Sequence, residues 1–260
     1  MLISIAATAD YDLPQETFLQ LMIEPRLEGA THRVIDERLR TTPTPFARLD
    51  SDIYGNPVRR LITPRGLFTF DFTATVETEP NRAIADSAPE IAPQDLPPDI
   101  LLYTLPSRYC PSDRLSRLAM GEFGSLPPGG RRVRAIAEWV HARTAYEYGT
   151  TDSNTAADDV VVQRVGVCRD FSHLVVSLCR ALCIPARYVS GYCLELDPPD
   201  FHAWSQVYLG GAWHNVDATF AGVRPALIPI AVGRDAADVS MLTLSGASQC
   251  REQSVRVERA

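Results

Sequence analysis

A proline-rich segment from Pro80 to Pro111 constrains the fold of this chain more than any other feature of its sequence. It mixes alanine and acidic residues with prolines, including the pair Pro97-Pro98. Proline fixes φ and lacks a backbone N–H donor, so this stretch cannot form a continuous helix or a central strand. The sequence therefore predicts a linker over residues 81–111, which separates a first unit at 1–80 from a second unit at 112–260.

The first unit has the periodicity of β-strands. Apolar residues alternate with other residues at Phe68, Phe70, Phe72, Ala74 and Val76. A period of two is that of a strand with one buried face. Turns rich in glycine and proline separate such runs, as turn geometry requires. We expect an antiparallel β domain here, and a β-sandwich is the preferred arrangement.

The second unit changes to a helical period and then returns to strands. After Cys168, apolar residues recur every three or four positions up to Leu182, shortly before Pro185. This spacing predicts a buried helix that begins at Cys168. Three segments with strand character follow, at about 186–194, 201–209 and 212–219. The predicted fold class is therefore α+β, with a helix packed on an antiparallel sheet.

The position of Cys168 favours a reactive thiol. A thiolate is stabilised at a helix N-terminus, because the first N–H groups are unpaired and the peptide dipoles point that way. The same N–H groups could hold the oxyanion formed when a carbonyl is attacked, although the sequence names no side-chain donor. The alternative interpretation is that Cys168 is a small buried residue, as many cysteines are.

A predicted hairpin brings a histidine and an aspartate together. With Gly210-Gly211 as the two turn residues, counting back places Trp204 opposite Asp217. His202 and Asp217 are then diagonal neighbours on one face, with Cβ atoms about 7 Å apart. An acid at that distance can fix the tautomer of the imidazole. This face would form a polar and aromatic wall of His202, Trp204, Gln206, Asn215 and Asp217, which we interpret as a working surface.

The other histidines have no such role. His173 lies about 140° around the helix from Cys168, at 100° per residue. His214 falls on the apolar face of the hairpin. His32 and His141 have no acidic partner that the sequence can place. No histidine pair or Cys-x-x-Cys motif indicates a metal site, so none is expected.

Three blocks of sequence resemble those of bacterial transglutaminase-like proteins. They are Gly166-Val167-Cys168-Arg169-Asp170-Phe171-Ser172-His173-Leu174, Phe201-His202-Ala203-Trp204 and Trp213-His214-Asn215-Val216-Asp217-Ala218-Thr219. The resemblance implies a papain-like core, with Cys168 as nucleophile, His202 as acid/base and Asp217 as the orienting residue. It also suggests Trp204, Tyr188 and Tyr192 as residues of the substrate cleft.

The resemblance limits the chemistry more than the substrate. Members of this family cleave or transfer amide bonds: some are peptidases, some cross-link glutamine to lysine, and some remove glycans or acyl groups. It implies neither the zinc of peptide N-glycanases nor the calcium of animal transglutaminases, so no cofactor is expected. Arylamine N-acetyltransferases share the Cys, His, Asp order and are a distant alternative. A catalytically silent binding or assembly module is the rival from another class.

The bulk properties exclude several partners. A net charge of −7 without any run of lysine or arginine argues against nucleic acid. Residues 1–9 fit neither a secretion signal nor a membrane helix, so we expect no membrane partner and a cytoplasmic protein. The six cysteines are too sparse for a disulfide framework. The expected partner is a peptide or protein amide, and the oligomeric state stays open.

Overall fold

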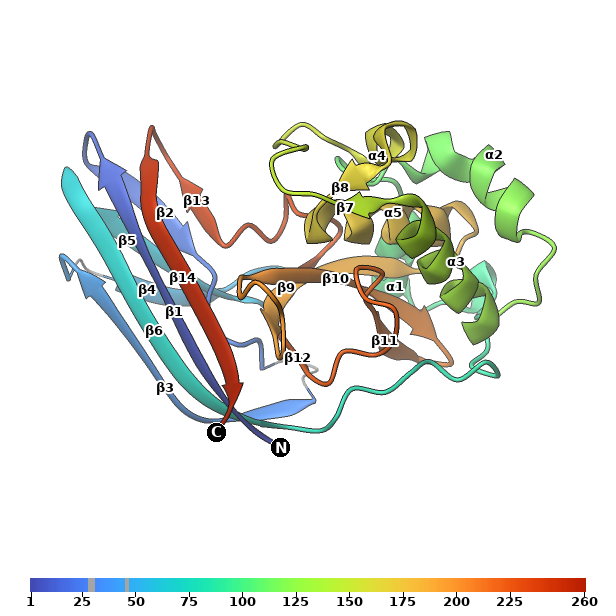
Figure 1. The fold of residues 1–260 in the computed structure, drawn as a ribbon, viewed down its shortest axis with the longest axis horizontal. Coiled ribbons are helices and arrows are strands. Elements are labelled where there is room, and N and C mark those ends of the chain that lie inside the picture. Colours follow the sequence, from blue (N-terminus) through green and yellow to red (C-terminus); the bar gives the residue numbers. More distant parts are fainter. Residues whose placement is uncertain (28–30, 45–46) are drawn as a thin grey trace.

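The computed structural model describes residues 1–27, 31–44 and 47–260, and its N-terminal part consists of two four-stranded sheets (Figure 1). The first sheet has the strand order β14-β1-β6-β3. Its strands are β1 (Leu2–Leu13), β3 (His32–Thr42), β6 (Gly66–Thr78) and β14 (Gln249–Arg259). The second sheet has the order β13-β2-β5-β4. Its strands are β2 (Thr17–Leu21), β4 (Ala47–Ser51), β5 (Pro57–Thr63) and β13 (Leu242–Leu244).

The two sheets share one hydrophobic core. On β6 the alternating residues Phe68, Phe70 and Phe72 are fully buried. They join a core cluster with Leu19 of β2 and Leu61 of β5, which belong to the opposite sheet. The period of two predicted this burial, because successive side chains of a strand point to opposite faces. The arrangement is that of a β-sandwich.

Residues 81–111 pack against the second unit along their length instead of forming a free linker. They contain only short helices: η1 (Pro93–Asp95), α1 (Pro98–Leu101) and η2 (Leu102–Thr104). The carbonyl of Ala88 accepts a hydrogen bond from Gly130, and that of Pro89 accepts one from Gly210, both at 2.9 Å. Proline thus prevents regular structure here, as expected, yet the segment is fixed by backbone hydrogen bonds.

The second unit places helices on a four-stranded antiparallel sheet of order β11-β10-β9-β12. The strands are β9 (Ala186–Cys193), β10 (His202–Leu209), β11 (Ala212–Val216) and β12 (Leu227–Gly233). The helices are α2 (Ser112–Phe123), α3 (Gly130–Arg143), α4 (Ala157–Gln163) and α5 (Cys168–Ala181). Two short strands, β7 (Ala145–Tyr146) and β8 (Val165–Gly166), pair in parallel. The α+β expectation is confirmed.

Helix α5 is the centre of this unit. Its residues Leu174, Val175 and Leu178 are fully buried, and they share a core with Val207 and Leu209 of β10. The predicted stripe was therefore correct, and the helix begins at Cys168 as the sequence indicated. None of the helices in the described residues is long and apolar enough to cross a membrane.

The two units are joined more closely than the predicted boundary at residue 112 implies. Strands β13 and β14 pair with β2 and β1, so the C-terminal strands lie with the N-terminal sheets and not with the helical core (Figure 1). Strand β9 in turn sends Tyr192 into the N-terminal core, where its hydroxyl donates to the Ile23 carbonyl at 2.7 Å. One core cluster therefore includes residues of both units.

Candidate active site

The hairpin of β10 and β11 brings His202 and Asp217 into contact. The observed register pairs Ser205 with Val216 and Leu209 with Ala212, as counted from the glycine turn. The His202 Nε2 lies 2.7 Å from Asp217 Oδ2. The predicted diagonal pairing thus becomes a direct hydrogen bond.

Asp217 is held by more partners than the sequence indicated. Its Oδ1 accepts hydrogen bonds from the Thr219 backbone N–H at 3.0 Å and the Thr219 hydroxyl at 2.7 Å. Its Oδ2 accepts a second hydrogen bond, from Arg224 Nε at 3.1 Å. Burial raises the pKa of this carboxyl, but the hydrogen bond and charge of His202, together with Thr219, lower it to about 2. Asp217 is therefore a buried, ionised carboxylate.

Sequence reasoning missed both additional partners. Thr219 had a local signal, since a side-chain oxygen that accepts from the backbone two residues on is a common turn feature of aspartate. Arg224 had none, because its position depends on the path of the loop after β11.

His202 is the positively charged partner of the Asp217 carboxylate. Its side chain is buried, and burial lowers its pKa. The hydrogen bond to Asp217, together with the charge of Asp217 and the influence of the Cys168 thiol, outweighs burial and raises the pKa to about 9. Because Nε2 is bonded to Asp217, Nδ1 is the nitrogen left for the thiol. Within the described residues, this Nδ1 has no hydrogen-bond partner.

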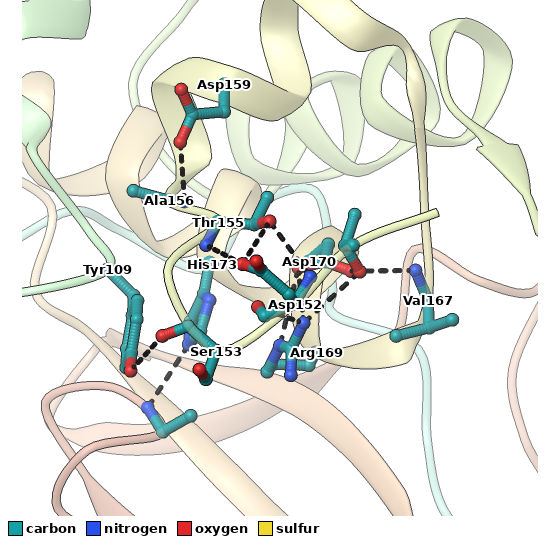
Figure 2. Close-up of polar contacts among 12 residues, drawn as sticks. Tyr109, Asp152, Ser153, Thr155, Ala156, Asp159, Val167, Arg169, Asp170 and His173 are labelled. Carbon is teal, nitrogen blue, oxygen red and sulfur yellow. Dashed lines mark hydrogen bonds and ion pairs between the residues drawn. The ribbon is translucent and has the colours of Figure 1, made fainter. Parts of the chain in front are cut away.

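Cys168 is the first residue of α5, and its sulfur is only partly buried. The helix start is fixed by the fully buried Asp170, whose Oδ2 accepts the Val167 N–H at 2.9 Å and the Thr151 hydroxyl at 2.6 Å (Figure 2). A carboxylate at the third helical position that bonds back to the capping residue is a known helix start. Gly166 is required beside it, because a Cβ there would lie 2.7 Å from the Asp170 Cβ.

The part of the predicted wall on β10 is buried, which corrects its interpretation as a working surface: His202, Trp204 and Gln206 have almost no exposed area, whereas Asn215 is partly exposed. Trp204 has no exposed area; its ring stacks on His202 with centroids 6.2 Å apart, and its Nε1 donates to Asn215 Oδ1. Gln206 donates to the same Asn215 oxygen. Gly191 allows this packing, since a Cβ there would lie 2.6 Å from the Trp204 ring. Trp204 therefore supports the imidazole from behind and does not line a cleft.

The two tyrosines suggested for the cleft differ from each other. Tyr192 is fully buried between the units, so it cannot contact a substrate. Tyr188 is also buried, and its ring packs 5.0 Å from that of His173. Burial, followed by the charge of Cys168, raises the pKa of Tyr188, which places it near the thiol beneath the surface.

His173 has a structural role. Its Nε2 accepts the Ala236 N–H at 3.1 Å, and its ring stacks on Tyr109 with centroids 5.2 Å apart. Figure 2 shows the two rings side by side, on the far side of the Asp170 cluster from Val167. Burial lowers the pKa of His173 well below its usual value, so the ring is neutral. The helical angle had correctly separated it from Cys168.

A cavity of about 360 Å³ borders the opposite side of Asp217. It is lined by Arg224, Phe220 and His141 among others, but neither Cys168 nor His202 reaches it. An acyl group bound to Cys168 would therefore lie elsewhere. Within residues 1–27, 31–44 and 47–260, no three His, Cys, Asp or Glu side chains are grouped to hold a metal ion.

The chain is similar to several known proteins. Residues 121–218 match the model of the transglutaminase-like superfamily. The structure superposes on that of a putative cysteine protease from Cytophaga hutchinsonii with a TM-score of 0.92, at 36% identity over 99% of this chain and 90% of that one. An uncharacterized protein of Mycobacterium leprae is 28% identical over 87% of this chain and 85% of its own. One of Mycobacterium tuberculosis is 28% identical, with 89% and 82% covered.

Proposed function

The chain belongs to the transglutaminase-like superfamily, and from this premise we propose that it is a cysteine-dependent amide hydrolase or acyl transferase. Cys168 is the proposed nucleophile, His202 the acid/base and Asp217 the orienting residue. The observation that carries the proposal is geometric: His202 Nε2 lies 2.7 Å from Asp217 Oδ2, and the partly buried Cys168 is the first residue of α5. Asp217 and Cys168 raise the pKa of His202 to about 9 despite its burial. An imidazole used only for packing would be neutral when buried, as His173 is.

The first half of the proposed reaction acylates the enzyme. The Cys168 thiolate attacks the carbonyl carbon, a C–S bond forms, and the π electron pair moves to the oxygen. When the tetrahedral adduct collapses, the C=O bond re-forms and the C–N bond breaks. The departing amine takes the proton from His202 Nδ1, which leaves a neutral imidazole and a thioester on Cys168. Asp217 holds the Nε2 proton throughout, so that Nδ1 stays directed at the thiol.

The second half releases the acyl group. Neutral His202 accepts a proton from the incoming nucleophile, which attacks the thioester and expels the thiolate. Water gives hydrolysis, and a primary amine gives acyl transfer. Both remain within the proposal, with a peptide or protein amide as the substrate.

All six cysteines are unpaired, which supports a reducing compartment such as the cytoplasm.

Selective alkylation tests the nucleophile. Cys110, Cys179 and Cys193 are buried, so a variant with Cys183→Ser and Cys250→Ser leaves Cys168 as the accessible thiol. Iodoacetamide should then add a single label, detected by intact mass, and Cys168→Ala should abolish it. We expect His202→Gln to slow the labelling severely, because the thiolate loses its counter-ion.

Turnover completes the test. A peptide library incubated with the protein, with and without a primary amine such as glycine methyl ester, distinguishes hydrolysis from transfer by the mass of the products. The same products formed at an equal rate by Cys168→Ala would end the enzyme proposal. A Cys168 that is labelled no faster than a denatured cysteine would favour the rival, a binding module that has lost turnover.

A further inference from the structure

The cavity beside Asp217 is enclosed by three segments of the chain. Residues 81–84 follow β6, α3 supplies a second wall, and residues 215–224 form the end of β11 and the loop after it. Positions 133, 137 and 141 of α3 are four residues apart, so they share the helix face that lines the cavity. The volume of about 360 Å³ falls within the range of about 300–1,000 Å³ that is usual for small-molecule sites.

Hydrogen bonds fix the three walls relative to one another. The Asn81 N–H donates to the Pro225 carbonyl at 3.0 Å, and Asn215 Nδ2 donates to Asn81 Oδ1 at 3.1 Å. On the helix side, His141 Nδ1 donates to the Ala218 carbonyl at 2.9 Å. The cavity is therefore preformed, and a ligand does not have to order these segments when it binds.

Most of the cavity lining is apolar. It includes Ile84, Val133, Ala137, Ala218, Phe220 and Val223. Protein interiors are close-packed, and atoms that face a void lose the contacts that a neighbour would give them. An apolar group in the cavity restores those contacts, whereas water finds few polar partners on such walls. The lining therefore favours a ligand with an apolar body.

Arg224 supplies the polar group of this cavity. Its Nε donates to Asp217 at 3.1 Å, and its Nη2 lies 3.4 Å from the Thr219 hydroxyl. The guanidinium lies over the Phe220 ring, 4.3 Å from the centroid. Within the part of the chain that the structure describes, it forms no other hydrogen bond. The N–H groups left over, both on Nη1 and one on Nη2, lie at the end of the guanidinium that can bind a carboxylate through two parallel hydrogen bonds.

The other arginines and the glutamate of the lining lie at its rim. Arg134 and Glu138 are exposed and are one helical turn apart on α3, and Arg134 also pairs with Asp86. Arg82 is exposed as well. Water screens such surface charges. The Arg224 side chain is only 11% exposed, so it sets the charge preference inside the cavity.

We propose that this cavity is a binding site for a small carboxylic acid with an apolar tail, whose carboxylate Arg224 holds. The tail packs on the apolar walls, and the carboxylate accepts hydrogen bonds from Nη1 and Nη2. Asp217 does not prevent this, because its own charge faces His202 as well as Arg224. The site goes beyond the proposed function and does not depend on it. The ligand and Asp217 would nevertheless share one guanidinium, so an occupied cavity would compete with Asp217 for Arg224.

Isothermal titration calorimetry of the full chain with octanoate tests the site. Octanamide is the matched neutral probe, since it has the same tail and nearly the same shape without the charge. Arg224→Gln removes the guanidinium, and Arg114→Gln is its control, because Arg114 forms an exposed ion pair on α2 and does not line the cavity. Ala137→Phe places a ring in the cavity from α3. Urea unfolding of each variant establishes that it is folded.

Octanoate should bind the parent saturably at a single site per chain. Arg224→Gln should weaken this binding by about tenfold or more, as loss of a charged hydrogen bond does, whereas Arg114→Gln should change it by less than about twofold. Octanamide should bind the parent more weakly than octanoate and lose less affinity in Arg224→Gln. Ala137→Phe should abolish saturable binding of both probes, since the ring occupies their space.

Absence of saturable octanoate binding to the parent would overturn the inference. So would equal affinities of octanoate for the parent and Arg224→Gln, or of octanoate and octanamide for the parent, because the carboxylate would then not be recognised. Octanoate that keeps its affinity in a folded Ala137→Phe would place the ligand elsewhere and overturn it too. None of these results depends on turnover or on the labelling of Cys168, so the proposed function is tested separately.

Discussion

Replacing Asp217 by Asn should lower the pKa of His202 by more than about 1 pH unit, equivalent to more than about 1.4 kcal/mol. In the native protein, hydrogen bonds and charges from Asp217 and Cys168 raise this pKa from 6.5 to about 9 against the effect of burial. The hydrogen bond from His202 to Asp217 is the largest of the causes that raise it. Loss of the Asp217 charge should therefore reverse much of this increase.

The comparison with Cys168→Ala gives the sharper test. Removing the thiol should lower the His202 pKa by less than Asp217→Asn does. Removing both groups should take it below 6.5, because only burial then acts on the ring. The ranking of the His202 pKa among Asp217→Asn, Cys168→Ala and the double variant depends on the geometry around His202. It does not depend on the absolute value of that pKa.

Histidine-selective NMR measures this directly. The chain has five histidines, and the His202 signal is identified by its loss in His202→Gln. A pH titration of the ring 13Cε1 resonance then gives the pKa in each variant. If Asp217→Asn left the pKa near 9, or lowered it less than Cys168→Ala does, the hydrogen-bonded pair would not be the source of the charge on His202.

Three further predictions concern the triad and the groups around it. Arg224→Gln should reduce the acylation rate roughly tenfold with little change in KM, because a charged hydrogen bond to Asp217 is worth about 1.5 kcal/mol; a kcat/KM profile tests this. Asp170→Ala should lower the free energy of unfolding by about 3 kcal/mol, as loss of a buried carboxylate does. Asp158→Ala, which removes a partly exposed carboxylate paired with the exposed Arg114, should change it by less than about 1 kcal/mol, and urea denaturation compares the two variants. Asp217→Asn should cost the most stability between pH 3.8 and 6.5. The contribution of the pair is lost as pH falls through about 2, where Asp217 protonates, and as it rises through about 9, where His202 deprotonates. In this pH range the free energy of unfolding of Asp217→Asn should be roughly 2 kcal/mol below that of the native protein, measured by thermal or urea unfolding. This magnitude is taken from the pKa change of Asp217, because the larger pKa change of His202 also contains the effect of Cys168.

Local periodicity predicted the parts of the fold that depend on neighbouring residues. The helix that begins at Cys168 and the hairpin register both follow from spacing, since a glycine turn and a helical stripe constrain the chain over short distances. The pairing of His202 with Asp217 came from that register. These features needed no knowledge of the rest of the chain.

Burial on the second face of the sheet could not be predicted in the same way. His202, Trp204 and Gln206 alternate as a polar face would, so the sequence indicated exposure. In the structure this face is covered by other segments, and Trp204 packs in a cluster with Tyr54, which is far from it in sequence. Burial of a sheet face depends on segments that are distant in sequence, so the local residue pattern does not predict it. The pairing of β14 with β1 escaped prediction for the same reason.

The N-terminal sandwich has a physical connection to the proposed chemistry. Gly191 of β9 pairs with His202 and leaves room for the Trp204 ring that stacks on the imidazole. The next residue, Tyr192, is anchored in the N-terminal core by its hydrogen bond to Ile23. A movement of the sandwich would therefore displace the strand that positions the back of the histidine. The shared core thus connects the sandwich, through β9, to the strand that carries His202 and Trp204.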